Sequence, residues 1–162
     1  MTRELNAFEV LEIAETMERE AARFYRKAAG MYNDPSMSKL FSELAQWEKR
    51  HVQVFADMKD HFSEQAWELG HFDLNRLDAS RLGVPPAVFD EHSEPAKELT
   101  GSEVRTDVLR LAIKKERYTI AYYTALTEFA LGQDNLTIIG DILEEERRHV
   151  RILMQSLQQA AG

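Results

Sequence analysis

The sequence predicts an all-α protein, a bundle of four long antiparallel helices with one long crossover between the second helix and the third. Only 7 Gly and 4 Pro occur among 162 residues, which leaves long stretches rich in good helix formers. Apolar residues recur in these stretches every three or four positions, the period of an amphipathic helix. The length suits one hydrophobic core, so we expect a single domain over residues 1–162.

The first two predicted helices form a hairpin. The first spans about Asn6–Tyr32, and Glu20 stands in the middle of its apolar stripe. The break at Asn33–Pro35 ends it, Ser36 is expected to cap the second helix, and that helix continues to about Phe62. The stripe of the first helix consists of Val10, Ile13, Met17, Phe24, Ala28 and Met31. A turn this short makes the two helices antiparallel neighbours.

A second hairpin follows the crossover. Its first helix spans about Gly101–Leu131, and Asp134 is expected to cap the last one, which runs nearly to the end of the chain. The crossover covers about residues 63–100, which is too long for a turn and too rich in Gly and Pro for another long helix. Its apolar residues are expected to pack on the helices or on a second subunit, and Pro86–His92 is a candidate short helix. These residues are Trp67, Phe72, Leu82, Val88 and Phe89.

The second hairpin repeats the first. The second helix contains Glu48-Lys-Arg-His51-Val, and the fourth contains Glu146-Arg-Arg-His149-Val. Each motif follows a helix with a glutamate in its apolar stripe, 28 residues earlier for Glu20 and 30 residues earlier for Glu116. The two hairpins are therefore interpreted as copies of one unit.

The repeated motifs predict a metal site. Residues three apart share a helix face, so each Glu-x-x-His presents a carboxylate and an imidazole to the bundle axis. Four buried carboxylates are too costly without counter-charge, and two divalent cations would neutralise them. Oxygen and imidazole ligands favour iron, with manganese second. The predicted cofactor is two iron ions, and the predicted ligands are Glu20, Glu48, His51, Glu116, Glu146 and His149.

Other polar residues lie near these motifs in the sequence. Tyr25 and Tyr123 are candidates to hydrogen-bond the ligand carboxylates, although core aromatics explain them equally well. Glu145 is a candidate extra ligand. The segment Glu68-Leu-Gly-His71 has the ligand spacing, but it falls in the crossover beside a glycine, so we do not expect it to bind metal.

Composition excludes several classes of site and partner. The absence of cysteine rules out thiolate ligands, disulfides and a rubredoxin-type centre within these residues. A net charge of −8 without a basic cluster argues against nucleic acid. The first residues lack the apolar run of a signal peptide and no stretch is long enough to span a bilayer, so the expectation is a cytoplasmic protein without a membrane partner.

The pattern Glu20, Glu48-x-x-His51, Glu116, Glu146-x-x-His149 resembles the di-iron site of the ferritin-like superfamily, and its surroundings are most similar to the rubrerythrin family. The resemblance covers the four helices and not the crossover. It implies terminal ligation by Glu20 and Glu116, bridging by Glu48 and Glu146, and one histidine on each metal. It also implies a homodimeric oxidoreductase that defends against oxidative stress, its Fe(II) pair oxidised by hydrogen peroxide or dioxygen.

Two departures from that family bear on function. Rubrerythrins usually carry another glutamate on the third helix, where this chain has Ile113 and Thr119, so the site is closer to that of bacterioferritin. Without cysteine, electrons would come from an external donor such as a rubredoxin-like protein. A ferroxidase feeding an iron store therefore remains an alternative. A metal-free helical interaction module, with the carboxylates as polar surface, is another.

Overall fold

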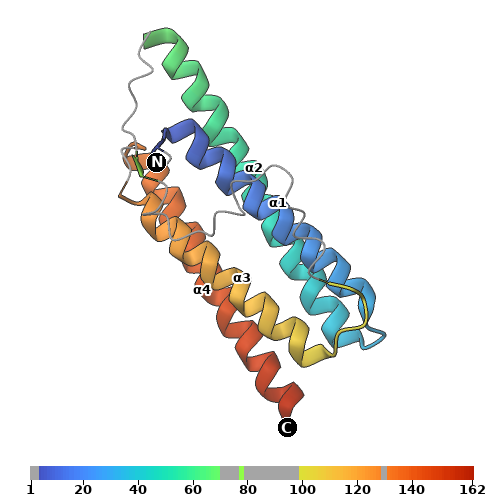
Figure 1. Ribbon diagram of the computed structural model, residues 1–162. Helices are drawn as coiled ribbons and strands as arrows, with labels where there is room; N and C mark the ends of the chain where they lie inside the picture. The colour runs from blue at the N-terminus through green and yellow to red at the C-terminus, as the bar shows by residue number, and fades with distance from the viewer. Residues whose placement is uncertain (1–3, 70–76, 79–98, 129–130) are drawn as a thin grey trace.

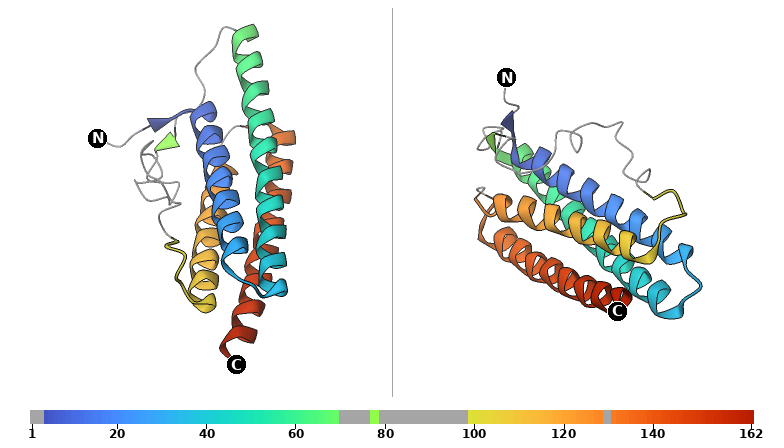
Figure 2. Two further views of the ribbon diagram at one scale, coloured as in Figure 1. Left: turned by 90° about the vertical axis from the view of Figure 1, so that its right-hand side faces the viewer. Right: turned by 60° about the horizontal axis from the view of Figure 1, so that its bottom comes forward.

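The computed structural model describes residues 4–69, 77–78, 99–128 and 131–162. It contains four long helices, and they pair as two antiparallel hairpins, α1 against α2 and α3 against α4 (Figures 1 and 2). Their bounds are α1 Ala7–Met31, α2 Pro35–Leu69, α3 Arg105–Leu126 and α4 Gln133–Ala161. The arrangement confirms the predicted all-α four-helix bundle. Among the described helices, none combines the length and apolar character that crossing a membrane requires.

The starts of α1 and α2 are set by side chains that accept backbone hydrogen bonds. Asn6 caps α1 and forms a reciprocal capping box with Glu9, at 2.9 Å and 2.8 Å. Before α2, the carboxylate of Asp34 accepts a hydrogen bond from the backbone N–H of Ser36 at 3.0 Å. The predicted cap Ser36 is therefore wrong. Pro35 takes the first helical position, where its missing N–H costs nothing.

In the second hairpin, α3 begins later than predicted, at Arg105 instead of about Gly101, and α4 begins slightly earlier, at Gln133 instead of after Asp134. The Glu103 carboxylate accepts hydrogen bonds from the backbone N–H groups of Thr100 and Gly101, which holds residues 100–103 in a turn ahead of α3. The residue before α4 is Gly132, whose φ of 82° favours glycine. Asp134 is not the cap but lies in the first turn, where a negative charge suits the helix dipole.

The crossover is shorter than predicted, because α2 continues to Leu69 instead of ending near residue 62. Two residues within it, Leu77–Asp78 (β2), pair antiparallel with Glu4–Leu5 (β1), a contact that the sequence did not predict. The α2 helix ends at the opposite end of the bundle from the start of α3 (Figure 1), as a long crossover requires. Outside the described residues lie Phe72, Leu82, Val88, Phe89, the candidate helix Pro86–His92, His71 and the side chains of Trp67 and Glu68.

The core consists of two apolar clusters with a polar layer between them. One cluster contains Phe55, Tyr123 and Leu126, and the other contains Tyr25 and Phe41. Each helix passes from one cluster to the other, and each carries one or two acidic or histidine side chains at the point of passage. The polar layer is therefore enclosed along the bundle axis by apolar side chains on both sides.

Candidate metal centre

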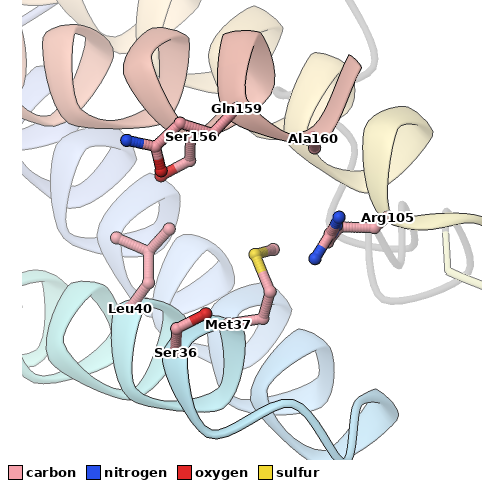
Figure 3. A pocket seen from close by; sticks show the side chains of 7 residues that line it. All are labelled: Ser36, Met37, Leu40, Arg105, Ser156, Gln159 and Ala160. Carbon is pink, nitrogen blue, oxygen red and sulfur yellow. The ribbon is translucent and has the colours of Figure 1, made fainter. Parts of the chain in front are cut away.

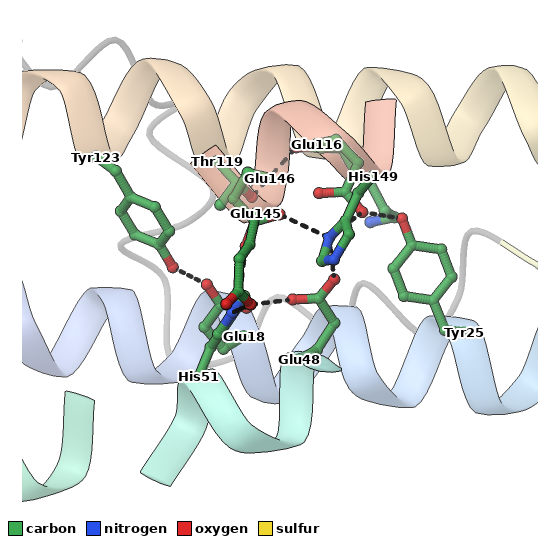
Figure 4. A network of polar contacts seen from close by, with 11 residues as sticks. Glu18, Tyr25, Glu48, His51, Glu116, Thr119, Tyr123, Glu145, Glu146 and His149 are labelled. Atoms are coloured by element: carbon green, nitrogen blue, oxygen red, sulfur yellow. Dashed lines mark hydrogen bonds and ion pairs between the residues drawn. The ribbon is translucent and has the colours of Figure 1, made fainter. Parts of the chain in front are cut away.

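All four helices contribute to the polar layer at the middle of the bundle (Figure 4). The hairpin α1–α2 supplies two carboxylates and one imidazole, and α3–α4 supplies the same set. None of the six residues is more than 3% exposed: Glu18, Glu48, His51, Glu116, Glu146 and His149. Carboxylates buried this deeply need hydrogen bonds and counter-charge, because removing a charge from water is costly.

One group of potential ligands surrounds Nδ1 of His51. This nitrogen lies 2.9 Å from Glu146 Oε1, 3.3 Å from Glu48 Oε2 and 3.6 Å from Glu18 Oε2. The ligand atoms of these four residues all lie within 4.8 Å of one another. The group therefore offers one cation three carboxylates and an imidazole.

A second group surrounds Nδ1 of His149. This nitrogen lies 3.1 Å from Glu146 Oε2, 3.3 Å from Glu48 Oε1 and 3.9 Å from Glu116 Oε1. Glu48 and Glu146 thus direct one oxygen toward each imidazole, whereas Glu116 belongs to this group alone and Glu18 to the other. The two groups therefore share Glu48 and Glu146, whereas Glu18 and Glu116, here called the terminal carboxylates, each belong to one group.

The α1 glutamate in this layer is Glu18, which corrects the prediction of Glu20. Five of the six predicted ligands come together, but Glu20 is half-buried and belongs to neither group. The buried face of α1 is rotated from the predicted stripe, because Ile13 and Met17 are only partly buried at its edge. The residues that line this face are Leu11, Ala14, Glu18, Ala22 and Tyr25.

The repeat itself contained the signal for Glu18. Thirty residues separate Glu18 from Glu48, as they separate Glu116 from Glu146, whereas Glu20 gives 28. Seven residues further along each helix stands a tyrosine, Tyr25 after Glu18 and Tyr123 after Glu116. The corresponding residues of the two hairpins are thus 98 positions apart throughout: Glu18 and Glu116, Tyr25 and Tyr123, Glu48 and Glu146, His51 and His149.

The two tyrosines bind the terminal carboxylates across the bundle. The hydroxyl of Tyr25 donates to Glu116, and that of Tyr123 donates to Glu18 (Figure 4). Both rings also belong to the apolar clusters, so the two roles that the sequence left open are combined. Burial and the nearby carboxylates raise the pKa of each tyrosine well above the usual range, which keeps both hydroxyls protonated as donors.

Further polar residues lie outside the two groups. Glu145 contacts the outer nitrogen of His51, Nε2, at 3.0 Å, so the structure places it behind the imidazole instead of among the ligands. The Thr119 hydroxyl donates to the Lys115 backbone oxygen, so its position supplies no extra ligand. Glu15 is buried on α1 and was not singled out in the sequence. Lys59, 2.7 Å away, and Arg19 neutralise its charge.

The acids of the layer respond differently to burial. Burial raises the pKa of Glu48 and of Glu116 well above the usual range, and repulsion from Glu146 adds to both shifts. Burial also acts to raise the pKa of Glu146, but the adjacent imidazoles of His149 and His51 outweigh it and hold that pKa below its usual range. Burial acts to lower the pKa of His51, but the adjacent carboxylates of Glu146, Glu18 and Glu48 raise it well above the usual range. Without metal, the layer therefore retains protons.

The residues present fit a pair of divalent cations. Three buried atoms have no hydrogen-bond partner within the described part of the chain: Glu48 Oε1, His51 Nδ1 and Glu146 Oε1. All three belong to the two groups, and buried polar atoms without partners are rare enough in proteins to require an explanation. Two divalent ions would give them partners, balance four carboxylates in charge and displace the retained protons.

A pocket at one end of the bundle offers no comparable chemistry. It lies between the start of α2, the start of α3 and the end of α4 (Figure 3). It is lined by Ser36, Met37, Leu40, Arg105, Ser156, Gln159 and Ala160, without a carboxylate or imidazole. The candidate site is therefore the buried layer and not this pocket.

Comparisons with known proteins lead to the same class of fold. Residues 1–59 match the sequence model of the Rubrerythrin family, a stretch that includes Glu18, Glu48 and His51. A solved structure from Thermotoga maritima, described as a ferritin-like diiron-carboxylate protein, superimposes with a TM-score of 0.78 over 99% of each chain, at 24% sequence identity. No curated protein matches the chain. The bundle is thus ferritin-like, as the sequence resemblance implied.

Proposed function

We propose that this protein is a di-iron carboxylate oxidoreductase of rubrerythrin type, which uses hydrogen peroxide or dioxygen to oxidise a bound Fe(II) pair. The observation that carries the proposal is the buried layer of four carboxylates and two imidazoles, in which Glu48 and Glu146 each face both histidines. When bound, two adjacent Fe(II) ions supply the two electrons that reducing a peroxide to water requires. The Rubrerythrin match of residues 1–59 supports the assignment.

The chain's own residues would hold and enclose the metal pair. Glu48 and Glu146 would each offer an oxygen to both metal positions, while Glu18 and His51 would complete one position and Glu116 and His149 the other. Tyr25 and Tyr123 orient the terminal carboxylates through hydroxyls that keep their protons at neutral pH. The apolar clusters on both sides exclude bulk water, which strengthens every electrostatic interaction in the layer.

A second candidate is a ferroxidase that supplies an iron store. The observation in its favour is the symmetry of the site, because the flanking position Ile113 lies in an apolar cluster and Thr119 bonds to its own helix. Neither supplies the additional glutamate that usually distinguishes rubrerythrins. The metal-free module is not favoured, because the carboxylates that it would expose to solvent are buried.

The partners belong to the proposal as well. Hydrogen peroxide or dioxygen would be the oxidant. An external donor such as a rubredoxin-like protein would return the electrons, since the 162 residues contain no cysteine for a rubredoxin centre. A homodimer would suffice for this activity, whereas iron storage requires a cage of many subunits. Light scattering of the purified protein separates these two assemblies.

The function is tested by rapid mixing. Protein loaded anaerobically with two equivalents of Fe(II) is mixed with one equivalent of hydrogen peroxide or with dioxygen, and the near-ultraviolet absorption of Fe(III) is followed. We expect oxidation by peroxide to be the faster and to be lost in a Glu48→Ala, Glu146→Ala double variant. Faster oxidation by dioxygen, with uptake well beyond two irons per chain, would favour the ferroxidase. Failure of both oxidants would exclude both candidates.

A further inference from the structure

The residue before each bridging glutamate reaches across to the imidazole of the opposite hairpin. Before Glu48 stands Trp47, and before Glu146 stands Glu145, so the two correspond in the 98-residue repeat. Trp47 of α2 stacks on His149 of α4, and Glu145 of α4 contacts His51 of α2. The same place in the two hairpins is therefore filled by an aromatic ring in one case and a carboxylate in the other.

The contact of Glu145 with His51 has a defined chemical effect. Glu145 Oε2 lies 3.0 Å from Nε2, while Nδ1 of the same ring faces Glu48 and Glu146. A carboxylate at Nε2 accepts a hydrogen bond from the Nε2–H group, which fixes the tautomer whose Nδ1 lone pair is available to a metal and makes the imidazole a stronger ligand. The Glu145 side chain is 43% exposed, so this support comes from the edge of the buried layer.

His149 is held in another way. The Trp47 ring lies parallel to the imidazole, with centroids 4.9 Å apart and an interplanar angle of 11°. An indole has a donor N–H and no acceptor atom, so it cannot accept a hydrogen bond from an imidazole N–H in the way that a carboxylate can. Trp47 therefore orients and covers the ring by packing alone, without raising its strength as a ligand.

We propose that the two metal positions are inequivalent, and that Glu145 is a positioning residue for the position formed by Glu18 and His51 only. Trp47 would instead orient His149 in the position formed by Glu116 and His149. Its fluorescence would also report metal binding there, because a metal on a stacked imidazole quenches indole fluorescence. The inference rests on the proposed metal pair. It predicts that loss of Glu145 weakens the binding of one of the two metal ions and leaves the binding of the other unchanged.

The test is an anaerobic Fe(II) titration of the apoprotein, followed by equilibrium dialysis for the total iron bound and by tryptophan fluorescence. The chain contains two tryptophans, so a Trp67→Phe background makes Trp47 the only reporter. In this background we expect Glu145→Ala to lower the affinity for one ion by about 10- to 100-fold, the usual effect of losing a carboxylate that hydrogen-bonds a metal-binding histidine. The ion that quenches Trp47 should bind as in the parent.

Two control variants separate positioning from simple charge. Glu144→Ala removes the same charge one residue away, from a side chain that is 64% exposed and paired with Arg147, and should leave both ions unchanged. Glu145→Gln keeps a carbonyl oxygen that can accept from Nε2, and should restore most of the lost affinity.

Suppose that the parent binds two ions. If Glu145→Ala then weakens the binding of both ions, of neither, or only of the ion that quenches Trp47, the inequivalence is overturned and the metal pair stands. Equal effects of Glu144→Ala and Glu145→Ala would reduce the role of Glu145 to surface charge. If Fe(II) does not quench the Trp47 fluorescence of the parent, the dialysis isotherm alone decides whether Glu145→Ala weakens the binding of one ion or of two. No tight Fe(II) in the parent would overturn the metal pair itself.

Discussion

The hydroxyl of Tyr123 on α3 donates a hydrogen bond to the carboxylate of Glu18 on α1. Its counterpart in the repeat, Tyr25 on α1, makes the same bond to Glu116 on α3. Each hairpin thus holds a terminal carboxylate of the other, and the two hydrogen bonds connect α1 and α3 on either side of Glu48 and Glu146. The site depends on the docking of the hairpins and cannot form in either alone.

The position of Glu18 predicts a contrast with its neighbour on the same helix. Glu18→Gln removes a buried carboxylate of the proposed metal site and should lower the iron bound from two ions per chain to about one. Glu20→Gln changes a half-buried residue outside both groups and should bind iron as the parent does. Iron analysis after anaerobic loading and desalting compares the two. If the Glu20 variant lost iron and the Glu18 variant did not, the ligand set predicted from the sequence, with Glu20, would be correct.

The tyrosines predict a second contrast, between adjacent residues. Tyr123→Phe removes a buried hydrogen bond to a carboxylate, which should cost roughly 1.5–3 kcal/mol of stability and weaken iron binding. Tyr122→Phe removes a bond to the Val10 backbone oxygen, which should cost about 1 kcal/mol and leave iron binding unchanged. Urea unfolding and Fe(II) titration of both variants check this. Equal effects on iron would deny Tyr123 a role at the site.

The retained protons predict that the metal-free protein is less stable at pH 8 than at pH 6. The pKa of His51 and the pKa values of Glu48 and Glu116 are raised in the folded state. A raised pKa contributes stability that is complete below the unfolded value and is lost as the pH rises toward the folded one. The lowered pKa of Glu146 contributes no slope here, because that group is ionised in both states above pH 6.

Urea midpoints of the apoprotein between pH 6 and pH 8 measure this slope. Loading with Fe(II) should reduce it, because metal displaces the protons that cause it. A Glu48→Gln, Glu116→Gln variant, whose side chains cannot ionise, should also show a shallower slope. A metal-free protein that gained stability toward pH 8 would contradict the account of a proton-holding layer.

The capping box of α1 predicts a local effect on stability that spares the site. Asn6→Ala removes the acceptor of the Glu9 N–H and should cost about 1 kcal/mol. Asn33→Ala, an exposed change in the turn after α1, should cost less than about 0.5 kcal/mol. Thermal unfolding of the two variants decides whether the cap contributes as the geometry implies, and both should keep the iron stoichiometry of the parent.

Sequence periodicity predicted the elements that many regularly spaced apolar residues specify. The four helices, their pairing and five residues of the site followed from apolar spacing and from the repeated Glu-x-x-His. The sixth residue, Glu18, did not, because Glu18 and Glu20 stand one on either side of Arg19, and the apolar stripe of α1 is broad enough to include either. The equal 30-residue spacing from Glu18 to Glu48 and from Glu116 to Glu146 is the sequence feature that distinguishes Glu18 from Glu20.

Features that depend on a single contact were not predictable. The helix starts at Arg105 and Gln133 depend on the Glu103 turn and on the φ of Gly132, which local patterns only approximate. The pairing of β1 with β2 involves two residues on each side and leaves no periodic signal. Trp47 and Glu145 flank the ligands in the sequence, but which imidazole each meets is determined by how the hairpins dock.

The central claim is that Glu18, Glu48, His51, Glu116, Glu146 and His149 hold two metal ions. Anomalous diffraction at the iron edge, from crystals grown anaerobically with Fe(II), tests it most directly. The account predicts two peaks per chain, one between Glu18 and His51 and one between Glu116 and His149, with Glu48 and Glu146 touching both. A single peak, a ligand from Glu20, or an ordered layer without any peak would contradict it.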